Sequence, residues 1–235
     1  MYSKIKKISK IAKNPRLFVK YYKNRKRKSF NVEDGEVIGI VKKKYNSYKD
    51  YTDHQKAKLE TIDNSTLSNY DKKFGNALMD RLKTGGEIKS GVSVLCLAAR
   101  TGTEVKSFIN LGCFAVGIDL NPGKDNKFVL PGDFHNLQYA DNCVNVVFTN
   151  SIDHSFDVDK LIAEVKRVLK PGGYFINEIA GANNNKEALK SNFEAIIWDD
   201  INIMVNKISE HGFKIIKIVN IEYPWEGKHV IYKLV

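Results

Sequence analysis

Residues 92–104 read Val-Ser-Val-Leu-Cys-Leu-Ala-Ala-Arg-Thr-Gly-Thr-Glu, and this stretch decides the fold of the 235-residue chain. Five of its first six residues are apolar, which is typical of a buried strand, and Glu104–Leu111 has a helical pattern. Small residues at 98, 99 and 102 connect the two. A strand that turns tightly into a helix lets a ligand approach the backbone and offers it free N–H groups. The stretch therefore predicts a cradle for a nucleotide-like ligand.

The rest of the chain repeats this alternation of apolar strands and helices. We expect strands at 114–119, 145–149 and 174–179, helices at 104–111, 157–169 and about 191–212, and closing strands at 214–221 and 229–234. Continuous apolar strands separated by helices indicate βαβ units and a parallel sheet covered on both faces. The two closing strands predict a terminal hairpin.

The region before residue 92 divides into three parts. A helical pattern from 65 to 83 predicts the first cover of a domain that spans 64–235. Residues 31–63 form an N-terminal extension with a short strand expected at 37–41 and a polar stretch at 42–51. Residues 1–30 form a basic amphipathic arm.

The arm carries all of the excess charge. It holds 12 of the 38 lysines and arginines and none of the 27 acidic residues, whereas the remainder is nearly neutral. This asymmetry indicates a polyanionic partner, such as a membrane surface, nucleic acid or an anionic glycan. Ile5, Ile8 and Ile11 recur at helical spacing, so the arm fits an anionic membrane surface, while its aromatic residues would also suit nucleic acid, which we favour less. A helix packed on the domain, with its lysines in solvent, is the third interpretation.

Cysteine usage and apolar runs limit the compartment. Cys96, Cys113 and Cys143 lie far apart without metal-ligand spacing, which favours a reducing compartment and argues against a zinc site. No apolar run predicts a secretory signal or a spanning helix. We expect a cytoplasmic protein, and the membrane interpretation of the arm would place it at the inner face of a membrane.

Five segments together resemble the class I S-adenosyl-L-methionine (SAM) dependent methyltransferases, in particular their small-molecule branch. They correspond to the glycine-rich first motif, the acidic end of the second strand, the segment beside the adenine, the fourth strand, and a helix–Pro-Gly-Gly–strand phrase: residues 94–102, 117–121, 131–134, 139–148 and 164–173. The resemblance implies a doubly wound, Rossmann-like α/β fold with a mostly parallel seven-stranded sheet, a C-terminal antiparallel hairpin, and helices on both faces.

The resemblance also implies a set of cofactor-binding residues. Asp119 would bind the ribose, Asp133 the adenine amino group, and Asn150 and Ser151 the sulfonium end. The full set is Ala98, Arg100, Gly102, Asp119, Leu120, Asp133, Phe134, Asn150 and Ser151.

The glycine-rich loop departs from the family. Cys96 replaces the usual acidic residue, and Ala98 and Arg100 stand where glycines are usual. Alanine is a mild change if its φ is negative. Arg100 would either point out of the loop or meet the methionine carboxylate of SAM.

Methyl transfer depends mainly on alignment, and a general base helps when the acceptor is a hydroxyl. Candidate bases are His154 and Asp153 after the fourth strand, with Glu178 as a further carboxylate. Residues 150–153 lack the prolines and aromatic residue that would hold a flipped base. We therefore expect O- or N-methylation of a small-molecule or glycan-type acceptor. A non-catalytic scaffold with this fold and an RNA methyltransferase that uses the arm remain alternatives.

Overall fold

The computed structural model describes residues 29–61 and 64–235, so almost all of the arm lies outside the described residues. Its interpretations as a membrane, nucleic-acid or packing segment therefore remain predictions. Within the part that is described, no helix combines the length and the apolar character needed to cross a bilayer.

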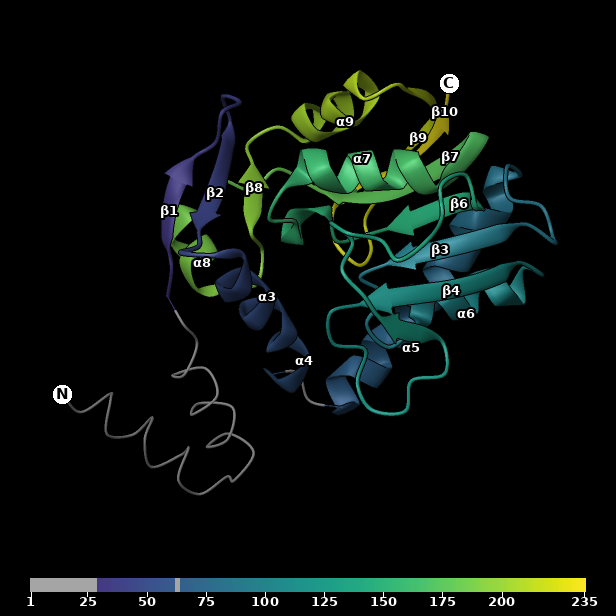
Figure 1. The fold of residues 1–235 in the computed structure, drawn as a ribbon, viewed down its shortest axis with the longest axis horizontal. Coiled ribbons are helices and arrows are strands. Elements are labelled where there is room, and N and C mark those ends of the chain that lie inside the picture. The colour runs from purple at the N-terminus through teal and green to yellow at the C-terminus, as the bar shows by residue number, and fades with distance from the viewer. Residues whose placement is uncertain (1–28, 62–63) are drawn as a thin grey trace.

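A seven-stranded sheet forms the centre of the protein (Figure 1). Its strands, in spatial order, are β5 (Val129–Pro131), β4 (Phe114–Asp119), β3 (Ser93–Leu97), β6 (Val144–Thr149), β7 (Leu169–Ala180), β10 (Gly227–Leu234) and β9 (Phe213–Ile221). The first five run parallel, and β10 pairs antiparallel with both β7 and β9. The predicted fold class and C-terminal hairpin are confirmed.

Helices cover both faces of the sheet, as predicted. On one face, α5 (Asn64–Gly85) and α6 (Thr103–Asn110) bury Phe74, Leu78 and Phe108 against β3 and β6. On the other face lie α7 (Val158–Val168) and α9 (Ile201–Glu210). Helix α7 begins where Asp157 accepts a hydrogen bond from the backbone N–H of Lys160, and its apolar stripe is fully buried.

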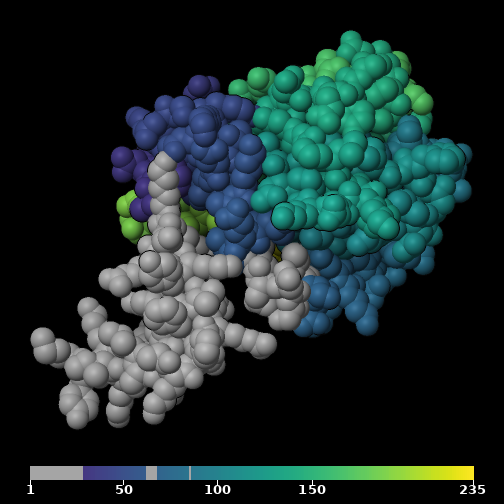
Figure 2. Space-filling view, turned by 60° about the horizontal axis from the view of Figure 1, so that its bottom comes forward, coloured from purple at the N-terminus to yellow at the C-terminus, as the bar shows by residue number. Residues whose placement is uncertain are grey.

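The N-terminal extension lies beside the carboxyl ends of the parallel strands, toward which the arrows of β3, β4 and β6 point in Figure 1. Its strands β1 (Asn31–Asp34) and β2 (Ile40–Lys44) form a small sheet with β8 (Ile196–Trp198). The chain then forms α3 (Tyr48–Lys56) and α4 (Lys58–Thr61). Figure 2 shows these dark-blue residues lying directly against the teal body of the protein.

Two local predictions are wrong. The helix expected at 191–212 is broken: α8 (Lys186–Ser191) ends before a buried strand, β8, and α9 begins after Asp200, whose side chain accepts from the N–H of Asn202. The apolar run in β8 is fully buried, so sheet pairing overrides helical periodicity there. The strand expected at 37–41 begins later, at Ile40 in β2, because residues 36–39 form a turn in which Gly39 has a positive φ of 88°.

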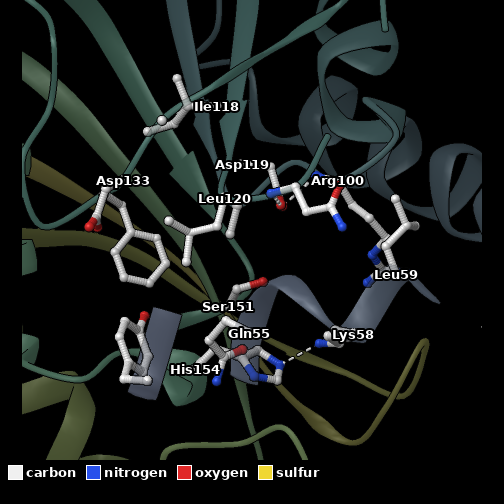
Figure 3. A pocket seen from close by; sticks show the side chains of 15 residues that line it. Gln55, Lys58, Leu59, Arg100, Ile118, Asp119, Leu120, Asp133, Ser151 and His154 are labelled. Atoms are coloured by element: carbon white, nitrogen blue, oxygen red, sulfur yellow. Dashed lines mark hydrogen bonds between the residues drawn. The ribbon is translucent and has the colours of Figure 1, made fainter. Parts of the chain in front are cut away.

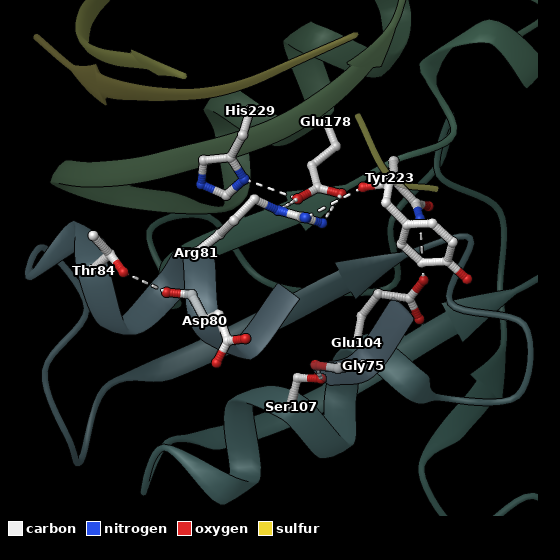
Figure 4. Close-up of polar contacts among 10 residues, drawn as sticks. Gly75, Asp80, Arg81, Thr84, Glu104, Ser107, Glu178, Tyr223 and His229 are labelled. Carbon is white, nitrogen blue, oxygen red and sulfur yellow. Dashed lines mark hydrogen bonds and ion pairs between the residues drawn. The ribbon is translucent and has the colours of Figure 1, made fainter. Parts of the chain in front are cut away.

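A buried ion pair fastens α5 to the sheet (Figure 4). The Arg81 guanidinium donates two hydrogen bonds to Glu178 on β7, at 2.7 and 3.0 Å, and His229 Nδ1 on β10 lies 2.9 Å from the same carboxylate. Arg81 also donates to the carbonyl of Tyr223. The Glu178 side chain is inaccessible to solvent. This clamp fixes α5 over the carboxyl end of β7 and the amino end of β10.

Candidate functional site

A pocket of about 580 Å³, counted with its opening to solvent, lies at the carboxyl ends of β3, β4 and β6 (Figure 3). This is the edge at which ligands bind in open α/β sheets, on either side of the point where strand order reverses. The sheet contributes one wall and the extension the other. The lining residues are Tyr51, Gln55, Lys58, Leu59, Ala98, Arg100, Ile118, Asp119, Leu120, Asn121, Gly132, Asp133, Phe134, Ser151 and His154.

The loop between β3 and α6 keeps a glycine-like backbone without its glycines. Ala98, Arg100 and Gly102 all have positive φ, at 53°, 45° and 86°. The condition that would make Ala98 a mild change is therefore not met, because a side chain is strained in this region. The loop nonetheless packs tightly, since a Cβ on Gly117 of β4 would lie 2.8 Å from that of Ala99.

Asp119 ends β4 and faces the pocket with its carboxylate held by backbone groups. One oxygen accepts from the N–H of Arg100 at 2.9 Å and the other from the N–H of Asn121 at 2.7 Å. A carboxylate has about four acceptor positions. Asp119 therefore connects the loop to the strand end and keeps acceptor positions for a ligand.

Asp133 and Phe134 lie at the far end of the pocket, after β5. Asp133 accepts from the backbone N–H and Nδ1 of His135, at 2.9 and 3.1 Å, and from the Tyr48 hydroxyl. Burial alone would raise the pKa of Asp133, but these hydrogen bonds outweigh it and lower the pKa. Phe134 is buried, and together with Leu120 it gives this end an apolar wall.

Arg100 lines the pocket, and its guanidinium lies 5.6 Å from the ring centroid of Tyr70 on α5. Within the described ranges, no carboxylate forms an ion pair with it. Its side chain is thus available to an anionic group in the pocket.

Two residues of the predicted cofactor set do not line the pocket. Gly102 forms the N-cap of α6, and Asn150 donates to Glu104 at 3.3 Å. Ser151, next to Asn150, does reach the pocket wall.

The two candidate bases after β6 lie in the short 3₁₀ helix η1 (Ile152–His154), but only His154 lines the pocket. Its Nδ1 lies 2.8 Å from the carbonyl of Phe193, and its Nε2 lies 2.7 Å from Nζ of Lys58. Burial, reinforced by Lys58, places the pKa of His154 well below its usual range. Burial also raises the pKa of Asp153 to about 6. Both imidazole nitrogens of His154 are therefore occupied.

Glu178, the third candidate, does not line the pocket. Its carboxylate is engaged by Arg81 and His229 in the clamp beneath α5. The sequence places it near the end of the fifth strand, but its hydrogen bonds give it a structural task.

Sequence reasoning missed the residues that the extension contributes, Tyr51, Gln55, Lys58 and Leu59. One pattern indicates their helix: Ser47 caps α3 by accepting from the N–H of Asp50, in the Ser-x-x-Asp arrangement of a capping box. Nothing in the sequence places that helix over the strand ends.

Comparison with known proteins agrees with the fold. Residues 95–177 match a family model described as a methyltransferase domain. The search of curated proteins finds no match to this chain.

Several solved structures share the architecture. The chain named as a methyltransferase in complex with the Haloferax volcanii Trm112 methyltransferase activator is 17% identical, with a TM-score of 0.57 over 71% of this chain and 94% of that one. A SAM-dependent methyltransferase from Aquifex aeolicus is 18% identical, with a TM-score of 0.51 over 67% of this chain and 89% of that one. A SAM-dependent methyltransferase from Methanosarcina mazei is 15% identical, with a TM-score of 0.53 over 65% of this chain and 96% of that one. At these identities the shared property is the fold.

Residues 95–177 match a methyltransferase domain, and the sheet order and the pocket at the carboxyl edge of the sheet agree with the fold of the SAM-dependent methyltransferases compared above. The resemblance found in the sequence is confirmed, and the cofactor that this domain implies is SAM.

Proposed function

We propose that this protein transfers a methyl group from SAM to a small-molecule or glycan-type acceptor, on oxygen or nitrogen. The observation that carries the proposal is one pocket that joins the Asp119 carboxylate, the apolar wall around Phe134 and the polar pair Lys58–His154. The first two features suit a nucleoside, and the third lies where an acceptor would meet it.

The residues present fit the cofactor. Asp119 would accept from the ribose hydroxyls, and Asp133 from the adenine amino group. Leu120 and Phe134 would lie against the adenine, while Ala98 and the positive-φ loop that ends at Gly102 allow close approach. Arg100 would meet the methionine carboxylate, and Ser151, with Asn150 behind it, would border the sulfonium end.

When bound, SAM supplies a methyl group that is already activated by its positively charged sulfur. The protein's task is then to align the acceptor and exclude water. Helices α3 and α4 close the outer wall with Tyr51, Gln55 and Leu59, and so shield the pocket. Ser151 and His154 border the inner wall, where polar groups can orient an acceptor.

The cofactor assignment is tested by calorimetry with S-adenosylhomocysteine on the full chain. We expect binding to the wild type and about 10–100-fold weaker binding to Asp119→Ala, because each hydrogen bond to a charged group contributes about 1.5–3 kcal/mol. Asp80→Ala, an exposed change on α5, should bind like the wild type. Failure of the wild type to bind either SAM or S-adenosylhomocysteine would overturn the proposal.

The acceptor class is tested by release of S-adenosylhomocysteine from SAM in the presence of pooled acceptors. Separate pools of small hydroxyl and amine compounds, oligosaccharides and RNA are compared at one protein concentration. Turnover confined to the first two supports the proposal, and turnover with RNA alone supports an RNA methyltransferase. Cofactor binding without turnover in any pool supports the scaffold alternative.

A further inference from the structure

Lys58 brings a positive charge into the pocket from outside the sheet. It lies in α4 of the extension, whereas every other charged lining residue follows a strand of the sheet. Figure 3 shows its side chain reaching His154 from the opposite wall. The 2.7 Å contact between Nζ and Nε2 joins residues 96 positions apart in the chain.

The partner of Lys58 is a neutral imidazole. The carbonyl of Phe193 can only accept, so His154 Nδ1 carries the proton and donates to it. Nε2 then has a lone pair and accepts from the Lys58 ammonium. In the described residues this is the sole hydrogen bond of that ammonium, and no carboxylate pairs with it. Two of its three N–H donors remain for another group.

A second unpaired cation lies at the same pocket. Arg100 approaches from the loop after β3, and its guanidinium has no ion pair with any described residue. Two cations that lack counterions at one partly enclosed pocket repel each other, and each loses hydration without gaining a partner of opposite charge. An anion bound between them offsets both the repulsion and the lost hydration.

We propose that Lys58 binds a carboxylate group of a ligand in this pocket, with Arg100 as the second cation of the same subsite. This inference rests on the proposed function, since the pocket must be the cofactor site. The carboxylate belongs either to the methionine part of the cofactor or to the acceptor. In the second case the substrates are small carboxylic acids.

The ionisation of Lys58 agrees with a missing counterion. Burial and the nearby Arg100 lower the pKa of Lys58 to about 8, against the opposing effect of surrounding acids. The charged or titratable groups around it are Arg100, Asp119, Asp153, His154 and Glu194. A bound carboxylate would return this pKa toward its ordinary value, so binding above pH 8 takes up a proton.

The first experiment compares two ligands that differ only in the amino-acid part. S-adenosylhomocysteine contains a carboxylate, and methylthioadenosine has the same nucleoside without it. Each is titrated by calorimetry into the wild type, Lys58→Met, Lys58→Arg and Lys56→Met. Lys56 is an exposed neighbour in the same extension, so its variant controls for the loss of one charge.

If the cofactor supplies the carboxylate, Lys58→Met weakens S-adenosylhomocysteine by about 10–100-fold and leaves methylthioadenosine unchanged. Lys58→Arg keeps most of the affinity, because the charge is retained. Lys56→Met binds both ligands like the wild type.

If the acceptor supplies the carboxylate, both nucleosides bind Lys58→Met normally. The protein saturated with S-adenosylhomocysteine then binds acetate and benzoate, but not acetamide and benzamide, in ligand-observed NMR. Lys58→Met loses this discrimination and Lys58→Arg keeps it.

The proposal is overturned if Lys58→Met binds both nucleosides and both carboxylates as the wild type does. Thermal melting establishes that each variant is folded, and Lys58→Gln repeats the test if the methionine variant is not. Failure of both nucleosides to bind the wild type would instead contradict the proposed function.

Discussion

Two contacts join a helix from the first part of the chain to the carboxyl edge of the sheet, and each uses a basic side chain and a histidine. On α5, Arg81 reaches Glu178, which also contacts His229 (Figure 4). On α4, Lys58 reaches His154 with no carboxylate between them (Figure 3). The first contact is electrically balanced, and the second is not.

The difference separates a structural contact from one prepared for a ligand. A buried charge is expensive unless a partner of opposite sign and hydrogen bonds compensate it. The α5 clamp meets this condition, and it lies outside the pocket. The Lys58 contact does not meet it, and it lines the pocket.

Glu104, in the first turn of α6, is the acidic counterpart of Lys58. Its side chain is buried, Asn150 donates to it at 3.3 Å, and no described lysine or arginine forms an ion pair with it. Balanced and unbalanced groups should therefore respond differently to substitution and to pH.

The largest effect is expected for Arg81→Met, which leaves Glu178 buried without its cation. Breaking one partner of a buried pair costs about 3–5 kcal/mol of unfolding free energy. Urea denaturation measures this loss. Lys83→Met, an exposed change on the same helix, should alter stability by less than about 0.5 kcal/mol. If the two variants are equally stable, the clamp does not hold α5 to the sheet.

Glu104→Gln should give the next largest effect, and it should depend on pH. Burial raises the pKa of Glu104 from 4.5 to about 7. Between these values the folded protein binds more protons than the unfolded chain, so the Glu104 contribution to stability falls as pH rises. Relative to the variant, the wild type should lose roughly 3 kcal/mol between pH 4 and pH 8.

Chemical denaturation at several pH values measures the difference between the two proteins. Glu187→Gln, an exposed acid on α8, controls for general charge effects. A difference between wild type and Glu104→Gln that stays constant from pH 4 to pH 8 would show that the carboxylate ionises normally.

The sheet wall of the pocket could be predicted from sequence because its residues are placed by local features. Asp119 follows an apolar strand directly, and its hydrogen bonds go to residues 2 and 19 positions away. The Pro-Gly-Gly phrase at 171–173 lies near the start of β7, where the pairing of β7 with β6 shifts in register. Periodicity and turn residues are enough to establish such features.

The extension wall could not be predicted in this way. The Tyr48–Asp133 and Lys58–His154 contacts span 85 and 96 positions and join side chains that no periodic pattern relates. Helix α3 is polar, so it lacks the apolar stripe by which α7 is found. The placement of Lys58 depends on how the extension docks, which only tertiary packing decides.

Lys58→Met tests the unbalanced cation through stability alone. Because the folded pKa of about 8 lies below the ordinary value of 10.5, the unfolded chain binds more protons between them. Stability due to Lys58 therefore rises with pH across this window. Relative to Lys58→Met, the wild type should gain about 1–2 kcal/mol from pH 8 to pH 10.5, with solvent screening included.

Thermal melting of both proteins over this range provides the measurement, with Lys56→Met as the control. A wild type that shows no gain over Lys58→Met would mean that Lys58 has an ordinary pKa and that its contact resembles the balanced clamp.

The smallest effect is expected for Tyr48→Phe, which removes the hydroxyl that joins α3 to Asp133. That carboxylate keeps its bonds to His135, so the loss should be about 0.5–1.5 kcal/mol, the net value of one hydrogen bond. Without the Tyr48 hydroxyl the pKa of Asp133 should rise, because this hydrogen bond is among those that lower it. NMR titration of the Asp133 carboxyl carbon in both proteins measures the change. If the pKa is the same in both, the hydroxyl does not bind this carboxylate in solution, and α3 is held over the pocket by its other contacts, such as the hydrogen bond from Asn121 Nδ2 to the carbonyl of Lys56.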